Sequence, residues 1–100
     1  MNELLELLDE AWDDESGFLG KLRSGEFDPV AGEAYVALLS RIPPAAGETV
    51  ETRLVQLIWF APMFIEWQMD RAVKNEDDLK QLSHIATQVH EAVSGVLGIP

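Results

Sequence analysis

Residues 54–67 constrain the fold more than any other part of the chain, because a helix there would be apolar around nearly its whole circumference. Its apolar side chains are Leu54, Val55, Leu57, Ile58, Trp59, Phe60, Ala61, Met63, Phe64, Ile65 and Trp67. Such a helix needs neighbours on most of its sides, so we expect it at the centre of the domain. Pro62 lacks an N–H and crowds the preceding turn. We therefore expect a kink there, or a split into two helices of roughly 49–60 and 63–74.

Three further helices are predicted from hydrophobic periodicity and capping signals. In residues 3–14 the apolar side chains share one arc of a helix and the acidic ones fill the opposite arc. A second helix should begin after Asp28, an N-cap candidate followed by Pro29, and end at Pro43. The last, about 77–95, repeats apolar residues at spacings of three and four. This seam consists of Leu79, Leu82, Ala86, Val89, Val93 and Val96.

The fold class predicted from these segments is all-α. No stretch alternates apolar and polar residues with a period of two, and no hairpin dipeptide occurs. A short turn is expected at residues 18–22. One hundred residues suffice for one hydrophobic core. We therefore expect a single domain, 1–100, that forms a compact bundle of four to five helices around the apolar central helix.

The chain is strongly acidic. Eighteen acidic and seven basic residues give a formal net charge of -11. Such a surface repels the phosphates of nucleic acids and anionic lipid headgroups, so we expect neither nucleic acid nor a membrane as a partner. It attracts cationic surfaces instead, and it would steer association with a basic protein.

The acidic residues are concentrated in the first third of the chain. Residues 1–33 contain ten acids and two bases, a net charge of -8. Asp13, Asp14 and Glu15 lie near the C-terminal end of the first helix, where the negative end of its dipole disfavours them. Acids spaced by four along the helix also repel each other. A solvated helix face is the simpler interpretation, but acids placed against helix stability favour a role in binding. The candidate partner-binding residues are Glu6, Asp9, Glu10, Asp13, Asp14, Glu15, Glu26 and Asp28.

The sequence contains no recognisable catalytic or metal-binding motif, so we expect no enzyme, no cofactor and no metal site. There is no cysteine, and His84 and His90 lie about 120° apart around a helix. We expect His84 at the surface and His90 near the apolar seam. Glu66 and Asp70, four residues apart, could share a proton or a cation. Neutralisation by Arg71, Lys74 or Arg53 is the simpler expectation.

Three tryptophans occur in one hundred residues, and their N–H groups need hydrogen-bond partners wherever they are buried. Trp59 and Trp67 belong to the apolar helix, where a core position is the ordinary expectation. Either of them could instead emerge at a groove or an interface and anchor a partner.

We expect a cytoplasmic protein. The N-terminus is acidic and lacks the basic region of a signal peptide. The longest apolar run, Leu57 to Ile65, is about half of the roughly 20 residues that span a bilayer.

The stretch from Gly17 to Asp28, followed by the 35–42 and 59–67 helices, resembles the small acidic immunity proteins of bacterial polymorphic-toxin systems. This resemblance implies an inhibitor that binds and neutralises a cognate toxin, and the acidic first helix would suit a basic toxin domain. The alternative is a homo-oligomeric, structural helical protein without catalytic activity. In that case residues 54–67 or the 79–96 seam would form a dimer interface.

Overall fold

The computed structural model describes residues 2–43 and 50–98. Throughout these two ranges the regular secondary structure is helical, which confirms the predicted all-α class. If α4 and α5 are counted as one bent helix, the described part of the chain contains five helices. The segments are α1 (Asn2–Glu10), α2 (Phe18–Arg23), α3 (Pro29–Ser40), α4 (Thr52–Ile58), α5 (Ala61–Ala72) and α6 (Glu76–Leu97).

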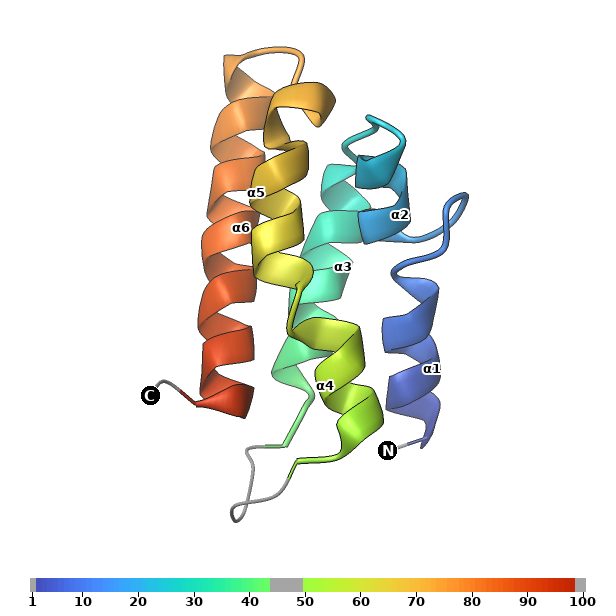
Figure 1. The fold of residues 1–100 in the computed structure, drawn as a ribbon. Coiled ribbons are helices and arrows are strands. Elements are labelled where there is room, and N and C mark those ends of the chain that lie inside the picture. The colour runs from blue at the N-terminus through green and yellow to red at the C-terminus, as the bar shows by residue number, and fades with distance from the viewer. Residues whose placement is uncertain (1, 44–49, 99–100) are drawn as a thin grey trace.

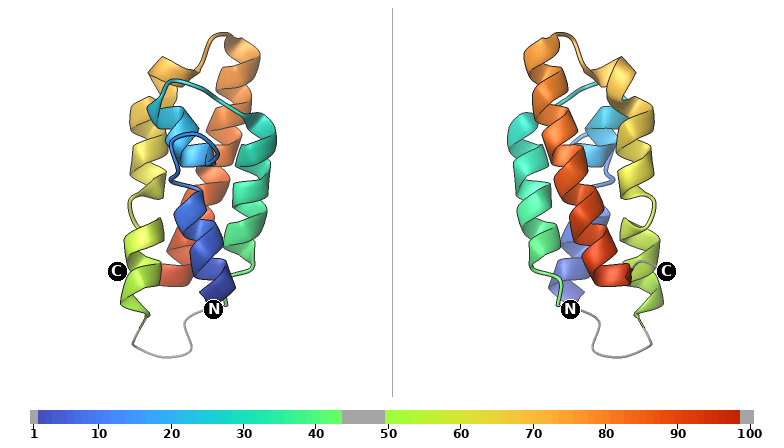
Figure 2. Two further views of the ribbon diagram at one scale, coloured as in Figure 1. Left: turned by 90° about the vertical axis from the view of Figure 1, so that its right-hand side faces the viewer. Right: turned by 90° about the vertical axis from the view of Figure 1, so that its left-hand side faces the viewer.

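The helices form a bundle of four columns (Figures 1 and 2). α6 packs against α3 and α5, while α1 and α2 cover the opposite side. α1 contacts α4 and α3, and α2 contacts α5 and α3. α1 and α2 follow one another along one column, and α4 and α5 along another, so that each pair takes the place of one long helix.

The predicted break in the apolar helix falls at residues 59–60, between α4 and α5, and Pro62 lies in the first turn of α5. Pro62 has no N–H to donate and its ring would clash with the carbonyl four residues earlier, that of Ile58. The first turn of a helix tolerates proline because N–H groups there lack intrahelical partners. The predicted helix start at residue 49 lies outside the described residues, and within them α4 begins at Thr52.

Side-chain caps mark the starts of two helices, and the cap of α3 is the one that was predicted. The Asp28 side chain accepts a hydrogen bond of 3.1 Å from the N–H of Ala31 and caps α3. Asn75 caps α6 in the same way, by accepting from Asp78 at 2.8 Å. The prediction for the first helix was too long, because α1 ends at Glu10 rather than at residue 14.

One cluster of buried side chains forms the core, with contributions from all six helical segments. The inner face of α6 consists of Leu82, Ile85, Val89, Val93 and Val96. Leu79 was predicted to belong to it but is 44% exposed. His90 was expected near this face and is exposed, because Val89 and Val93 take the inward positions. The 79–96 seam is thus largely used within the chain.

No helix in the described ranges is long and apolar enough to cross a membrane.

Candidate protein-binding surface

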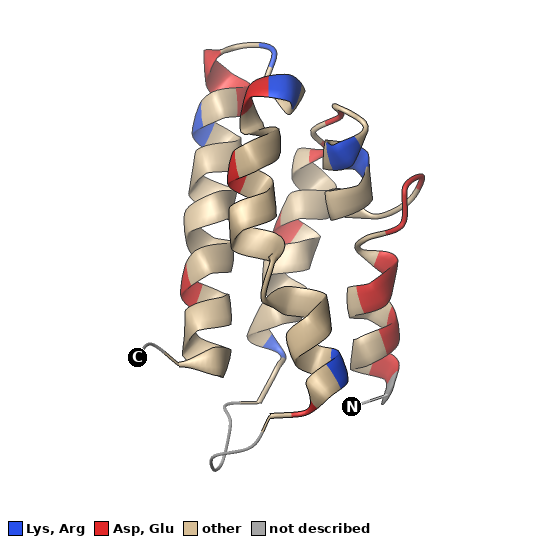
Figure 3. Cartoon of the chain, viewed as in Figure 1, with Lys and Arg blue, Asp and Glu red and all other residues tan. Residues whose placement is uncertain are grey.

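The structure groups six of the eight candidate acids on one side of the molecule. Figure 3 shows acidic residues along α1 and the loop that follows it. We call this set the acidic face. Glu26 and Asp28 lie apart from it, in the connection between α2 and α3 at the other end of the bundle (Figure 1). The acidic face consists of Glu6, Asp9, Glu10, Asp13, Asp14 and Glu15.

Asp13 holds the loop after α1 in shape. Its carboxylate accepts hydrogen bonds from the backbone N–H of Glu15 at 3.1 Å, from the N–H of Ser16 at 3.0 Å and from the Ser16 hydroxyl at 2.9 Å. The Ser16 backbone contributes most to lowering the pKa of Asp13 below its usual range. Asp13 therefore stabilises a turn. Hydrogen bonds that the sequence did not predict thus hold this acid near the negative end of α1.

Backbone contacts fix this loop against α2. The carbonyl of Ala11 accepts hydrogen bonds from the N–H groups of Leu19 at 2.8 Å and Gly20 at 3.2 Å. A Cβ on Gly20 would overlap the backbone of Asp13, and one on Gly17 would overlap the Ala11 carbonyl. The two glycines thus allow the close approach that holds the acidic face in place.

Three other candidate acids have partners within the chain. Asp9 forms an ion pair with Arg53 at 3.1 Å, and Asp14 forms one with Arg23 at 2.8 Å. Asp28 pairs with Lys21 at 2.9 Å in addition to capping α3. The Lys21 side chain, followed by the Ala31 N–H, lowers the pKa of Asp28.

Glu6, Glu10, Glu15 and Glu26 are exposed and make no ion pair with any residue in 2–43 or 50–98. Their charges are free to act on a partner.

Exposed apolar side chains lie along α4 and α5. Trp59, Met63 and Trp67 project from the outer side of α4–α5 and are 55%, 46% and 63% exposed. The Phe60 ring lies 5.3 Å from both the Trp59 and the Trp67 ring, measured between centroids. We call these four residues the aromatic patch. The expectation that Trp59 and Trp67 belong to the core was wrong, because Phe64 and Ile65 take the buried positions instead.

Trp12 joins the two surfaces. Its indole N–H donates a hydrogen bond of 2.8 Å to the Leu57 carbonyl, and its ring lies 5.1 Å from that of Phe64. Phe64 is 6.0 Å from Phe60 in the aromatic patch. The Arg23 guanidinium lies over the rings of both Trp12 and Phe64, at 5.9 and 5.6 Å. A continuous series of rings therefore runs from the end of α1 to the exposed tryptophans.

Glu66 and Asp70 are exposed on α5, and neither forms an ion pair within the described residues. The expected neutralisation was wrong, since Arg53 pairs with Asp9 and Arg71 donates to Gln68. The groove between α5 and α6 is lined by Glu66 but not by Asp70. Among residues 2–43 and 50–98, no group of three His, Asp or Glu side chains is arranged to hold a metal ion.

The aromatic patch as a unit was missed at the sequence level, although a signal for it exists. Trp59, Met63 and Trp67 are spaced by four and so share one side of a continuous helix. On a helix that is apolar all round, that spacing does not distinguish the outer side from the inner one.

Comparison with known proteins gives no relative for this chain: no protein-family model matches it, and no curated protein or solved structure is significantly similar to it.

Proposed function

We propose that this protein binds a basic protein through the acidic face and the aromatic patch together. The observation that carries the proposal is the exposure of Trp59 and Trp67, which ring contacts through Phe60 and Phe64 connect to Trp12 at the acidic loop. Contiguous exposed apolar surface is characteristic of interaction sites. Tryptophan is among the residues that contribute most to binding energy when an interface buries it.

The two surfaces would have different roles in binding. The unpaired carboxylates of Glu6, Glu10 and Glu15 would raise the association rate with a basic surface. The aromatic patch would slow dissociation by filling apolar recesses of the partner. The turn closed by Asp13 also favours binding, since a rigid surface loses little conformational entropy when a partner binds to it.

Net charge favours a basic partner over a second copy of the chain. A two-fold symmetric dimer places the same surface of both copies in contact. A dimer formed through the aromatic patch would therefore bring two acidic faces close together, and like charges at an interface are costly. The 79–96 seam, the other interface considered for a dimer, packs mainly inside the bundle.

The specific form of the proposal is an immunity-type inhibitor that acts in the bacterial cytoplasm and neutralises a cognate toxin. The sequence resemblance, rather than the geometry, singles out a toxin among basic proteins. Co-expression tests this form directly. The immunity hypothesis predicts that the adjacent reading frame encodes a large secreted protein, and the C-terminal domain of that protein is the toxin domain to use. Restored growth of cells that make this domain is the expected result, and unchanged toxicity would contradict the immunity function.

Binding kinetics test the interface. Against that domain, Glu6→Gln, Glu10→Gln and Glu15→Gln together should lower the association rate by roughly tenfold at low salt and reduce its salt dependence. The matched control removes three charges elsewhere, by Glu33→Gln, Asp77→Asn and Glu91→Gln. If both triple variants lowered the association rate equally, the net charge of the protein alone would control that rate, and the role of the acidic face would be overturned.

Trp67→Ser tests the anchor. It should raise the dissociation rate by about 30-fold or more, as expected for a residue that dominates binding energy. An unchanged dissociation rate would contradict the role of the aromatic patch. Sedimentation velocity of the free protein at several concentrations tests the alternative, since a dimer that Trp67→Ser dissociates would assign the patch to self-association.

A further inference from the structure

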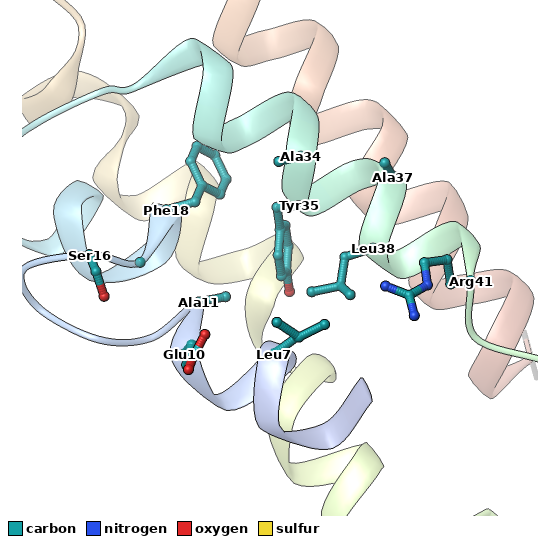
Figure 4. Close-up of a pocket in the computed structure, with 11 residues that line it drawn as sticks. Leu7, Glu10, Ala11, Ser16, Phe18, Ala34, Tyr35, Ala37, Leu38 and Arg41 are labelled. Atoms are coloured by element: carbon teal, nitrogen blue, oxygen red, sulfur yellow. The ribbon is translucent and has the colours of Figure 1, made fainter. Parts of the chain in front are cut away.

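A cleft of about 470 Å³ opens between α1 and α3 (Figure 4). Most of its wall is apolar, whereas Glu10, Ser16 and Arg41 add polar groups. Its volume falls within the range of roughly 300–1,000 Å³ that is usual for small-molecule sites. The apolar lining consists of Leu7, Ala11, Phe18, Ala34, Ala37 and Leu38.

The Tyr35 hydroxyl is the unusual group in this cleft. Tyr35 is only 3% exposed, and its hydroxyl has no hydrogen-bond partner among the described residues. Figure 4 shows the ring reaching from α3 toward α1, with the hydroxyl between Ala11 and Leu38. Buried hydroxyl groups are nearly always hydrogen-bonded. Burial also raises the pKa of Tyr35, so that the phenol keeps its proton and can act as a donor.

Arg41 supplies a second donor. It follows α3 directly and lines the cleft. Its side chain forms no ion pair with residues 2–43 or 50–98. In Figure 4, Arg41 and Glu10 lie on opposite sides of the Tyr35 hydroxyl. Arginine can only donate hydrogen bonds, so a matching ligand presents acceptors on the Arg41 side.

We propose that the cleft between α1 and α3 binds a small organic carboxylate with an apolar aryl or alkyl body. The carboxylate accepts hydrogen bonds from the Arg41 guanidinium and, once the side chain of Leu7 or Leu38 turns aside, from the enclosed Tyr35 hydroxyl. The body packs against the apolar wall, and Glu10 repels the negative group and so fixes its orientation. This site shares only Glu10 with the acidic face, and it does not depend on the proposed protein partner.

Two matched probes test the ligand class. Phenylbutyrate and phenylbutanol share an apolar body, but only the first carries a carboxylate. In amide NMR titrations of the full chain up to roughly 10 mM, phenylbutyrate should shift resonances of Leu7, Ala11 and Leu38, and phenylbutanol should bind more weakly. Arg41→Gln should remove this preference for the acid. Shifts confined to the aromatic patch, equal binding of both probes, or no shifts at all would overturn the proposal.

Tyr35→Phe separates a ligand-binding hydroxyl from a structural one. The variant should weaken phenylbutyrate binding by about tenfold. It should also raise the melting temperature of the free protein by about 4 °C, because it removes a buried polar group that has no partner. A lower melting temperature would show that the hydroxyl is already satisfied in the free protein, and would overturn its role.

Blocking the cleft gives an independent test. Ala34→Phe places a ring in the cleft from an exposed position on α3, and it should abolish binding of the probe. Val30→Phe is the control, because Val30 is exposed on the same helix and does not line the cleft. Unchanged binding to Ala34→Phe would contradict the site. Concentration-dependent shifts at the cleft without any probe would assign it to a second copy of the chain instead.

Discussion

Asp28 allows a sharp test of whether a candidate binding acid has a structural role. Its carboxylate caps α3 through the Ala31 N–H and pairs with Lys21 at 2.9 Å. Alanine removes both interactions. Asparagine removes only the charge, because its side-chain oxygen can still accept from the Ala31 N–H and asparagine is as good an N-cap as aspartate.

The two variants should differ in stability by the value of the cap. Loss of an N-cap costs about 1 kcal/mol. The Lys21–Asp28 pair is partly exposed, with 21% and 30% of the two side chains accessible, so its loss costs about 0.5 kcal/mol. In urea denaturation at neutral pH we expect Asp28→Ala to lose about 1.5 kcal/mol and Asp28→Asn about 0.5 kcal/mol.

The pH dependence follows from the lowered pKa of Asp28. The hydrogen bond from Lys21 is its main cause, and the Ala31 N–H adds to it. Because the folded pKa lies below the unfolded value of about 3.9, the contribution of the charge is complete above that pH. It is lost as the pH falls through the folded pKa. The difference between the wild type and Asp28→Asn should therefore shrink steadily as the pH is lowered below about 3.9.

Equal destabilisation by asparagine and alanine would refute this reasoning, because it would show that the charge alone matters. A difference between the wild type and Asp28→Asn that persists in acid would refute the role assigned to the ion pair.

Three further predictions concern Gly20, Trp12 and Tyr35. Gly20→Ala should cost more than about 2 kcal/mol of unfolding free energy, since its Cβ would overlap the backbone of Asp13; Gly95→Ala, where no atom lies within 4 Å, should gain about 0.5 kcal/mol. In the same denaturation assay Trp12→Phe should lose about 1 kcal/mol with its hydrogen bond to Leu57, whereas Trp67→Phe should be neutral. Tyr35 is the single tyrosine, and burial raises its pKa. An ultraviolet titration should therefore show no tyrosinate at about pH 10 while the chain stays folded. The free energy of unfolding should fall above that pH, because only the unfolded chain then loses the tyrosine proton.

The sequence predicted those features that depend on local chemistry. The start of α3 follows from Asp28 and Pro29, whose capping and backbone preferences act within a few residues. The break near Pro62 was equally accessible, because proline excludes one particular backbone hydrogen bond. The early end of α1 was missed, since the acidic residues continue in helical register to Asp14 while Asp13 and Ser16 already form a turn.

Features that depend on how the columns pack were not predictable in this way. The periodicity of α4–α5 cannot show which side remains uncovered, because nearly every position is apolar. The uncovered side depends on which helices pack against α4 and α5. These are α1 and α2, which are distant in sequence, and α6, which follows α5 directly. The cleft between α1 and α3 depends on the same kind of contact between distant segments. Its key group, the Tyr35 hydroxyl, carries no sequence signal of its own.

The N–H groups of Leu19 and Gly20 both donate to the Ala11 carbonyl, and this arrangement determines which residues can be substituted without loss of the fold. The loop after α1 is held by backbone atoms, by two glycines and by Asp13, whereas Glu6, Glu10 and Glu15 contribute no ion pair to the described structure. Those three positions can therefore vary freely without disturbing the scaffold. Gene copies that diverge at them can acquire new binding preferences while they inherit the same fold.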